Sequence, residues 1–473
     1  MRGLSTFMPI YNEDRVAIAV TPEMLRKNDR PGPRYTSYPT APMWRESFGS
    51  SAYRQALKKA SLTPDDPLAL YIHIPFCQER CAFCGCNVII GRKEGLADTY
   101  LDYVEKELSM LATGLGNRRG LAQMHWGGGT PTFLDLDQIQ RLHNAVSAHF
   151  AFLPEAEVAL EMDPRVTTEA QVGLLRDLGF NRVSMGVQDL DPEVQCAIHR
   201  NQTEEQTRHL FGVCRQAGFT GINIDLVYGL PSQRPERWKD TVQKILDIRP
   251  DRLALYSYAY LPDRLRNQKH IEPSELPDTE TKYALFAEAR EGFVKGGYVA
   301  IGMDHFAMPH DELCQAVEQR RLYRNFMGYT VTHAPDMVAV GTSAIGEVGG
   351  CFAQNEKKLS RYYEAIDEGE FPTACGCELT DDDRIRAWVI RELMCNFHID
   401  FAAFESRFGV AFESYFERER ESLAGFEQDR MIAATDAAVD VLPLGQIFVR
   451  NIAMAFDAYL KRPDSPVRYS RTV

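Results

Sequence analysis

The chain has 473 residues, of which 44% are hydrophobic and 25% charged, and its formal net charge is −13; this length predicts two or more domains, and this charge disfavours nucleic acid as a partner. No apolar run approaches the roughly 18 residues of a membrane span, and no basic segment followed by an apolar stretch opens the chain, so the sequence predicts neither membrane insertion nor export. The eleven cysteines are an odd number, clustered in part in one short loop, which is typical of the reducing cytoplasm rather than of a disulfide framework.

Residues 1–50 lack the sustained hydrophobic periodicity of a helix or a strand, so we predict an N-terminal arm over this range. Within the arm, residues 34–40 read Arg-Tyr-Thr-Ser-Tyr-Pro-Thr, a polar and aromatic string whose proline disfavours a helix. From the residues alone, the arm could simply lie on the protein surface.

A cysteine-rich loop follows residues 68–74, a mostly apolar run that predicts a buried strand. Cys77, Cys81 and Cys84 are spaced Cys-x3-Cys-x2-Cys, and Cys86 follows two residues later. Thiolates select iron or zinc, but structural zinc sites are usually built from paired Cys-x2-4-Cys knuckles, and no second pair follows nearby. The spacing therefore favours an iron–sulfur cluster over zinc or a disulfide, with three protein thiolates and one iron left open for a substrate.

Strand-like and helix-like segments alternate between residues 51 and 372. The strand-like segments cover residues 68–74, 121–126, 158–162, 182–187, 221–227 and 252–257. Segments of helical period lie at residues 97–111, 136–150, 169–178, 204–218 and 237–248, and a helix at 280–296 and a strand at 298–301 follow. The alternation predicts an α/β domain built as a partial (β/α)6 barrel, with ligand-binding groups on the loops after the strands.

Polar residues stand where several of these strands end. Residues 125–132, His-Trp-Gly-Gly-Gly-Thr-Pro-Thr, include three glycines that let the backbone approach a ligand closely, although a glycine run alone could be a tight turn. Glu161, Gln188 and Asp225 lie near the ends of later strands, and Arg200 lies in a connection. Such groups suit a ligand better than a core, although each could instead be a solvated side chain.

The alternation stops near residue 373, and we predict a mainly helical C-terminal domain over residues 373–473. Its helical segments lie at residues 381–395, 401–408, 411–423 and 446–459, with a short strand at 440–444. This order is compatible with a winged helix, but the acidic residues spread from Glu405 to Asp429 disfavour DNA as its ligand.

At the cysteine loop, the residues resemble a known family. The string Cys-x3-Cys-x-Phe-Cys resembles the signature of radical S-adenosylmethionine (SAM) enzymes. The longer string ending Phe83-Cys84-Gly85-Cys86-Asn87, together with residues 34–40, resembles the oxygen-independent coproporphyrinogen III oxidases (dehydrogenases) of haem biosynthesis. The resemblance runs from Arg34 to Arg471, and it implies an arm that folds over the active site and a C-terminal domain that covers the substrate.

The resemblance implies a set of site residues. Cys77, Cys81 and Cys84 would hold a [4Fe-4S] cluster whose fourth iron is open to SAM, and Cys86 would have a catalytic or substrate-side role rather than being a plain loop thiol. Members of the family are alike in having two SAM positions. The iron-bound SAM would contact Tyr71, Gly128, Glu161 and Ile345. The second SAM would contact Phe83, Gly129, Thr130, Gln188, Arg200, Asp225 and Ala259.

The resemblance also implies the reaction of an oxidoreductase. An electron from a donor such as flavodoxin or ferredoxin would cleave SAM, and the resulting 5′-deoxyadenosyl radical would remove a hydrogen from a propionate β-carbon of coproporphyrinogen III. Loss of CO2 and a further electron leaves a vinyl group, and two such reactions give protoporphyrinogen IX. We expect a monomer, and the substrate carboxylates require cationic partners, for which Arg34, Arg165 and Arg324 are open candidates.

Three other functions share parts of this pattern. Haem-binding, haem-chaperone-like radical SAM relatives keep the three cluster cysteines but lack the fourth, so Cys86 and residues 34–40 favour the oxidase. Haem-modifying radical SAM methyltransferases share the core and would be distinguished by a methylated product. A non-catalytic iron–sulfur regulator would bind DNA through its helical tail, which the acidic charge disfavours.

Overall fold

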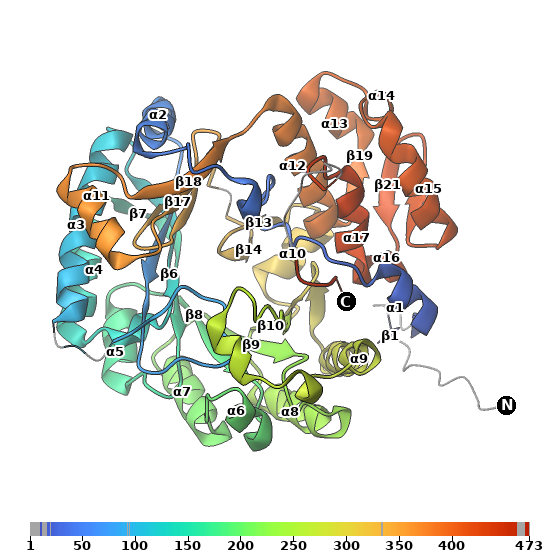
Figure 1. Ribbon diagram of the computed structural model, residues 1–473, viewed down its shortest axis with the longest axis horizontal. Helices are drawn as coiled ribbons and strands as arrows, with labels where there is room; N and C mark the ends of the chain where they lie inside the picture. Colours follow the sequence, from blue (N-terminus) through green and yellow to red (C-terminus); the bar gives the residue numbers. More distant parts are fainter. Residues whose placement is uncertain are drawn as a thin grey trace. The chain divides into compact units, whose positions relative to one another are not determined.

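The computed structural model (Figure 1) describes residues 10–11, 17–18, 20–91, 93, 95–332, 334–460 and 469–472. These residues group into two compact units, each made of several chain segments. Unit 1 comprises the described parts of Met1–Met43, Leu226–Val331 and Thr380–Val473, and unit 2 comprises those of Trp44–Asp225 and Thr332–Leu379. The predicted division into residues 1–50, 51–372 and 373–473 runs along the chain and stays a prediction; residues 1–9, 12–16 and 19 of the arm lie outside the described residues.

The core of unit 2 is a parallel sheet. Strands β3 (Leu68–Ile74), β6 (Gly120–Gly128), β7 (Ala151–Met162) and β8 (Arg182–Gln188) are neighbours in that order, and each adjacent pair is parallel. Strand β9 (Gly221–Tyr228) follows, with its residues up to Asp225 in unit 2. Since β3 is buried on both faces, its sequence is an apolar run rather than an alternation.

Helices cover the outer side of these strands in Figure 1, where they are coloured cyan to green. They are α3 (Leu96–Leu115), α4 (Leu136–His149), α5 (Glu169–Asp177), α6 (Pro192–Ala197) and α7 (Glu204–Gln216). Helices α4, α5 and α7 each begin with a capping box, in which an Asp or Thr and a Gln three residues later satisfy the first free backbone N–H groups. The predicted α/β alternation is confirmed here.

Unit 2 continues into an antiparallel extension that the sequence did not predict. Strand β15 (Asp336–Val340) is parallel to β3, and β16 (Ile345–Val348), β17 (Cys351–Asn355) and β18 (Thr373–Glu378) follow it as an antiparallel ladder. Helices α2 (Ser50–Ala60) and α11 (Leu359–Asp367) also belong to this unit. The loop before β16 is thereby held at the carboxyl end of β15, next to the end of β3.

Unit 1 contains the later strands of the alternation. Strand β12 (His305–Ala307) is antiparallel to both β10 (Arg252–Ser257) and β11 (Val299–Ile301), so the regular parallel order ends here. Helices α8 (Pro235–Ile248) and α9 (Thr279–Lys295) match the predicted segments. Helices α1 (Pro22–Asn28) and α10 (Glu312–Glu318) and the hairpin of β13 (Tyr323–Asn325) with β14 (Gly328–Thr330) complete this part.

The C-terminal segment of unit 1 is mainly helical, as predicted. Helices α12 (Asp381–Asn396) and α13 (Phe401–Phe408) match, and β19 (His398–Asp400), β21 (Ala438–Val441) and β20 (Ile432–Ala434) form a small sheet. The single helices predicted at 411–423 and 446–459 are wrong. The first is divided into α14 (Phe412–Tyr415) and α15 (Arg420–Gln428), and the second into α16 (Pro443–Ile447) and α17 (Val449–Ala453).

Two buried aromatic residues explain these breaks. Phe416 and Phe448 both leave the helical conformation where the chain turns, and their rings are 1% and 2% exposed in the aromatic core of unit 1. Core packing thus outweighs the helical periodicity of each segment.

The arm string 34–40 is not helical and packs within unit 1. Tyr35 donates a hydrogen bond to Asp457 at 2.9 Å, and the Ala458 N–H donates to the hydroxyl of Tyr38 at 3.0 Å. Both tyrosine side chains are buried, so this part of the arm is a packed element rather than a loose surface strand. Within the described part of the chain, no helix combines the length and apolar character needed to cross a bilayer.

Candidate active site

The cysteine loop is closed by backbone pairing at both of its ends. Strand β4 (Phe76–Cys77) pairs in parallel with β5 (Ile89–Ile90), so the chain leaves β3, makes a loop and returns to its start. The glycine run then holds the loop from the side, because the Gly129 N–H donates to the Ile74 carbonyl and the Thr130 N–H to the Phe76 carbonyl, both at 2.8 Å.

The glycines are required by this close approach. A Cβ atom at Gly129 would lie 2.7 Å from the Phe76 carbonyl oxygen, and one at Gly128 would lie 2.8 Å from the Ile74 carbonyl oxygen. Gly128 also has φ +124°, which L-residues with side chains rarely adopt. The run is therefore a surface on which the cysteine loop packs, rather than a simple tight turn.

The thiols of Cys77, Cys81 and Cys84 have the surroundings of cluster ligands. They are not in disulfides. Cys77 Sγ lies 3.4 Å from the Thr130 hydroxyl, and the backbone N–H of Cys86 donates to Cys84 Sγ at 3.4 Å. Hydrogen bonds to sulfur support thiolates in iron–sulfur sites. Within the described residues no three His, Cys, Asp or Glu side chains converge on one ion, whereas a cubane cluster takes each thiolate on a different iron.

Two arginines contact Cys81, the remaining thiol of the three. Arg200 Nη1 lies 3.6 Å and Arg165 Nη2 3.9 Å from Cys81 Sγ. Asp163 holds both guanidinium groups, at 2.6 Å from Arg165 and 3.3 Å from Arg200. Burial would raise the pKa of Asp163, but the two arginines outweigh it and lower that pKa. Of the arginine candidates for substrate carboxylates, Arg165 is thus already engaged beside the cluster loop.

A buried histidine connects β3 with the far end of the cysteine loop. His73 Nε2 lies 3.1 Å from the Asn87 carbonyl oxygen, which can only accept, so this nitrogen carries the proton. Nδ1 then accepts a hydrogen bond from the Tyr71 hydroxyl at 3.1 Å. Burial lowers the pKa of His73, which agrees with this neutral tautomer. The arrangement fixes the Tyr71 hydroxyl and the segment that follows Cys86.

Glu161 lies at the same strand ends and contacts the glycine run. Its Oε2 accepts a hydrogen bond from the Gly128 N–H at 3.1 Å, and its Oε1 lies 3.6 Å from His125 Nε2. Burial would raise the pKa of Glu161, but His125 and the Gly128 N–H favour the carboxylate and lower the pKa. An ionised acceptor at this point can bind an ammonium group. Tyr71, Gly128 and Glu161, all predicted for the iron-bound SAM, are thus brought together.

The residues predicted for the second SAM lie in several places. Gln188 ends β8 with φ 70°, and a Cβ at Gly186 would lie close to both Gln188 and Arg200, so these two side chains are neighbours. Asp225 accepts hydrogen bonds from Ser184 at 3.1 Å and from Asn223 at 2.7 Å. Phe83 is half-buried in the cysteine loop and Ala259 belongs to unit 1, while Ile345, predicted for the iron-bound SAM, is half-buried at the start of β16. The assignment of all these residues to SAM stays a prediction.

Comparisons with known proteins agree with this geometry. Residues 71–245 match the model of the radical SAM superfamily, and residues 379–448 match that of the HemN C-terminal domain. Over 450 residues the chain is 42% identical to the oxygen-independent coproporphyrinogen III oxidase of Escherichia coli K12, covering 95% of this chain and 98% of that protein. The chain belongs to the oxygen-independent coproporphyrinogen III oxidase family.

Further relatives in this family support the same relationship. The enzyme of that name from Pseudomonas aeruginosa is 39% identical over 453 residues, covering 95% of this chain and 98% of the relative. The solved structure of coproporphyrinogen III oxidase (HemN) from Escherichia coli, a radical SAM enzyme, superposes with a TM-score of 0.87, covering 90% of this chain and 97% of that one. The predicted radical SAM fold is confirmed, and membership implies a [4Fe-4S] cluster and SAM as cofactors.

Three residues of this site were not predicted from the sequence. His73 lies inside an apolar strand and His125 precedes the glycine run. Asp163 lies between Glu161 and Arg165, which were both candidates. A polar residue within a buried strand is the signal that could have revealed His73, since such a group requires a partner. Asp163 and Arg200 are far apart in the chain, so no local sequence pattern predicts that they form an ion pair.

Proposed function

We propose that this protein catalyses the oxygen-independent oxidation of coproporphyrinogen III, converting two propionate side chains to vinyl groups and giving protoporphyrinogen IX with release of CO2. The observation that carries the proposal is the cysteine loop, in which three thiols contact hydrogen-bonding groups and a fourth is exposed, in a chain related over nearly its full length to enzymes of that name.

The residues of the loop bind and orient the cofactors. Cys77, Cys81 and Cys84 would hold the [4Fe-4S] cluster and leave one iron without a protein thiolate. When bound, the cluster supplies the electron that cleaves the sulfonium of SAM and so provides the 5′-deoxyadenosyl radical. Glu161 would accept the SAM amino group, and Tyr71 would contact the cofactor beside it. Their fixed positions rest on the hydrogen bonds to Gly128 and His73.

Two decarboxylations require two SAM cleavages, and we assign the second SAM to a separate set of side chains. The set is Phe83, Gly129, Thr130, Gln188, Arg200, Asp225 and Ala259. Arg200 contacts Cys81 Sγ and is a neighbour of Gln188, which supports placing these two residues beside the cluster loop. Ile345 completes the first set.

Cys86 is assigned a role toward the substrate. Its side chain is exposed, whereas Cys81 is buried and Cys77 and Cys84 are half-buried. An exposed thiol beyond the last cluster ligand can give or take a hydrogen atom or proton without disturbing the cluster. This arrangement favours the oxidase over a haem-chaperone-like relative, which lacks the fourth cysteine.

The reaction needs a reductant, and we assign that role to a one-electron donor such as flavodoxin or ferredoxin in the cytoplasm, with the enzyme acting as a monomer. The test is an anaerobic assay in which the protein, reconstituted with iron and sulfide, receives reductant, SAM and coproporphyrinogen III. The expected result is a product with two vinyl groups together with 5′-deoxyadenosine. A methylated tetrapyrrole, or SAM cleavage with no vinyl product, would contradict the proposal.

A further inference from the structure

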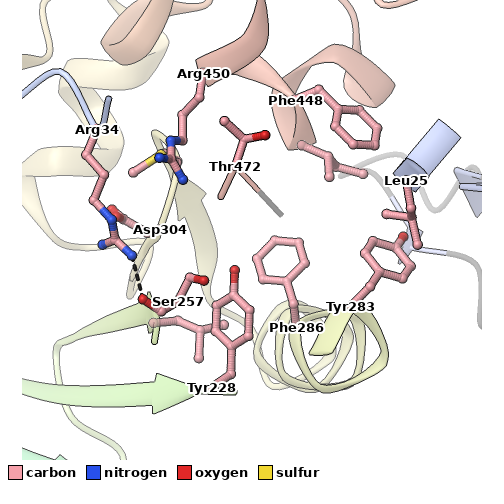
Figure 2. Close-up of a pocket in the computed structure, with 13 residues that line it drawn as sticks. Leu25, Arg34, Tyr228, Ser257, Tyr283, Phe286, Asp304, Phe448, Arg450 and Thr472 are labelled. Carbon is pink, nitrogen blue, oxygen red and sulfur yellow. Dashed lines mark hydrogen bonds between the residues drawn. The ribbon is translucent and has the colours of Figure 1, made fainter. Parts of the chain in front are cut away.

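A small cavity in unit 1 has one cationic side and one apolar side. Figure 2 shows the guanidinium groups of Arg34 and Arg450 on one side, with Asp304 next to Arg34. The rings of Phe286 and Phe448 stand on the other side, from α9 and from the turn between α16 and α17. The arm, the strands and the C-terminal segment of unit 1 thus all contribute to one lining.

Arg450 is a buried cation that is held in place by backbone groups. Its side chain donates to the carbonyls of Pro33 at 3.1 Å and Arg471 at 3.2 Å and to that of Gly32. A guanidinium has five N–H donors, so these three bonds leave two of them for another acceptor. The residue is only 6% exposed, which makes those donors costly to leave without an anion or water.

Arg34 has more donors to spare than Arg450. Its Nη2 donates to the Ser257 carbonyl at 2.6 Å (Figure 2). Next to it, Arg324 donates through Nη1 to the Arg34 carbonyl at 2.9 Å, while its buried Nε has no hydrogen-bond partner. Within the described part of the chain, none of these three arginines has a carboxylate within ion-pair distance. The three guanidinium groups therefore lack a matching set of anions.

Asp304 is the acidic side chain that lines this cavity, and it does not balance the charge. Its Oδ1 lies 2.7 Å from His305 Nδ1, and its buried Oδ2 has no hydrogen-bond partner. Burial would raise the pKa of Asp304, but His305, Arg324 and Arg34 outweigh it and hold the carboxyl ionised. One carboxylate thus faces three guanidinium groups in a chain whose total charge is −13.

Two cations near this cavity have lowered pKa values. Burial, together with the charge of Arg34, lowers the pKa of Arg450 to about 10 and that of Lys282 to about 8. Burial is the largest cause of both shifts, and repulsion from the guanidinium group of Arg34 adds to it. A bound anion would relieve this repulsion.

The size and the apolar side restrict the class of anion. The cavity volume is about 50 Å3, and one water needs roughly 10–15 Å3 on the same scale. The cavity can hold a carboxyl group with one or two attached methylene groups, and it is too small for a tetrapyrrole ring. Because most of the lining residues are aromatic or aliphatic, an inorganic anion would leave apolar surface uncovered, whereas a propionate would cover it.

We propose that this cavity binds one propionate carboxylate of the tetrapyrrole substrate, with Arg34 and Arg450 as its hydrogen-bond donors. The inference rests on the proposed function for the identity of the substrate and adds the site that anchors it. It selects Arg34 from the three candidate arginines. Arg324 positions Arg34 by donating a hydrogen bond to the Arg34 carbonyl, and Arg165 contacts Cys81 of the cluster loop.

The test is a fluorescence titration of the reconstituted enzyme with coproporphyrin III, the fluorescent oxidised form of the substrate. The variant is Arg34→Gln, and the matched control is Arg26→Gln, which removes the same charge from an exposed residue of unit 1 that pairs with Glu280. We expect Arg34→Gln to raise the dissociation constant at least about tenfold, as for loss of a charge-assisted hydrogen bond. Arg26→Gln should leave it unchanged.

A second probe, the tetramethyl ester of coproporphyrin III, assigns the loss to the carboxylates. The wild type should bind this ester, which lacks all four carboxylates, more weakly than the free acid, and the affinity difference between the two probes should be smaller in Arg34→Gln than in the wild type. Iron content and the unfolding midpoint check that Arg34→Gln is folded. If it is not folded, Arg34→Lys replaces it, and its dissociation constant should lie between those expected for the wild type and for Arg34→Gln. Equal affinity of Arg34→Gln and Arg26→Gln for coproporphyrin III would overturn the inference. Tight binding without vinyl product in the wild type would instead contradict the proposed function alone.

Discussion

The four cysteines of one short loop differ in what surrounds each thiol. Cys81 is buried beside two guanidinium groups, Cys77 contacts the Thr130 hydroxyl, and Cys84 accepts a backbone N–H. Cys86 is exposed. Each of the first three therefore has a group that stabilises a thiolate or fixes its position, and the fourth is open to a reaction partner.

This difference predicts distinct effects of two serine substitutions. Cys84→Ser should lose the cluster, because one of its three thiolate ligands is removed, and SAM cleavage should fall below detection. Cys86→Ser should keep the iron content of the wild type while turnover falls at least about a hundredfold, the usual scale for loss of a proton-transfer group. The measurement is iron per chain together with vinyl product. Loss of iron from Cys86→Ser would mean that Cys86 is a ligand.

At the scale of single residues, the sequence predicted the groups whose motif is local. The cysteine spacing, the glycine run and Glu161 are recognisable because each is defined within a few positions, and the structure brings Tyr71, Gly128 and Glu161 together. The groups that orient them were missed. Asp163 forms an ion pair with Arg200, and His73 donates a hydrogen bond to the Asn87 carbonyl. Both partners are distant in sequence, so these roles appear only when the loops are folded.

At the scale of elements, the glycine run is the part that fixes the cysteine loop to the sheet. Gly129→Ala would place a methyl group against the Phe76 carbonyl and should lower the free energy of unfolding by about 1–3 kcal/mol, with less iron bound after reconstitution. The matched control is Gly173→Ala in α5, where a Cβ meets nothing within 4 Å and the added helix propensity should be neutral or stabilising. Equal iron content and stability in both variants would refute this role of the run.

Helix α3 carries a buried carboxyl that joins it to the antiparallel extension. Glu107, 1% exposed, accepts hydrogen bonds from Tyr362 at 2.6 Å, Asn355 at 2.6 Å and the Gly341 N–H at 2.8 Å. Burial outweighs these donors and raises the pKa of Glu107 to about 7. A raised pKa means that the folded state binds the proton more tightly than the unfolded state does.

This carboxyl predicts a pH dependence of stability. Its contribution is complete at acidic pH, below the pKa of an ordinary glutamate, and it is lost as the pH rises through about 7. Between pH 5 and pH 8, the free energy of unfolding of the wild type should fall relative to that of Glu107→Gln by on the order of 1–3 kcal/mol. Urea unfolding of both proteins across this range measures the difference. A difference that does not change with pH would show that Glu107 does not titrate there.

The predictability of each element followed the strength of its local pattern. Amphipathic helices with capping residues, such as α4 and α7, were predicted to within a few residues. The ladder from β15 to β18 was not, because its strands are short and their pairing is decided by partners distant in sequence. Two predicted helices are broken at Phe416 and Phe448, whose buried positions in the core depend on tertiary packing rather than on local periodicity.

At the scale of the whole molecule, the charge distribution separates two kinds of site. The chain is acidic overall, so attraction of an anionic substrate cannot come from its total field. The cations that matter are local: half-buried Arg165 and buried Arg200 lie beside the cluster loop in unit 2, and half-buried Arg34 and buried Arg450 lie in unit 1. One set supports thiolates, and the other is proposed to hold a carboxylate.

The account depends on a cluster that the protein leaves one thiolate short, so that SAM can bind to the open iron. The most direct measurement is the electron paramagnetic resonance spectrum of the reduced, reconstituted enzyme before and after addition of SAM, with metal analysis of the same sample. We predict a [4Fe-4S] signal that changes when SAM is added and that remains in Cys86→Ser. Zinc in place of iron, or an iron signal that SAM leaves unchanged, would contradict the account.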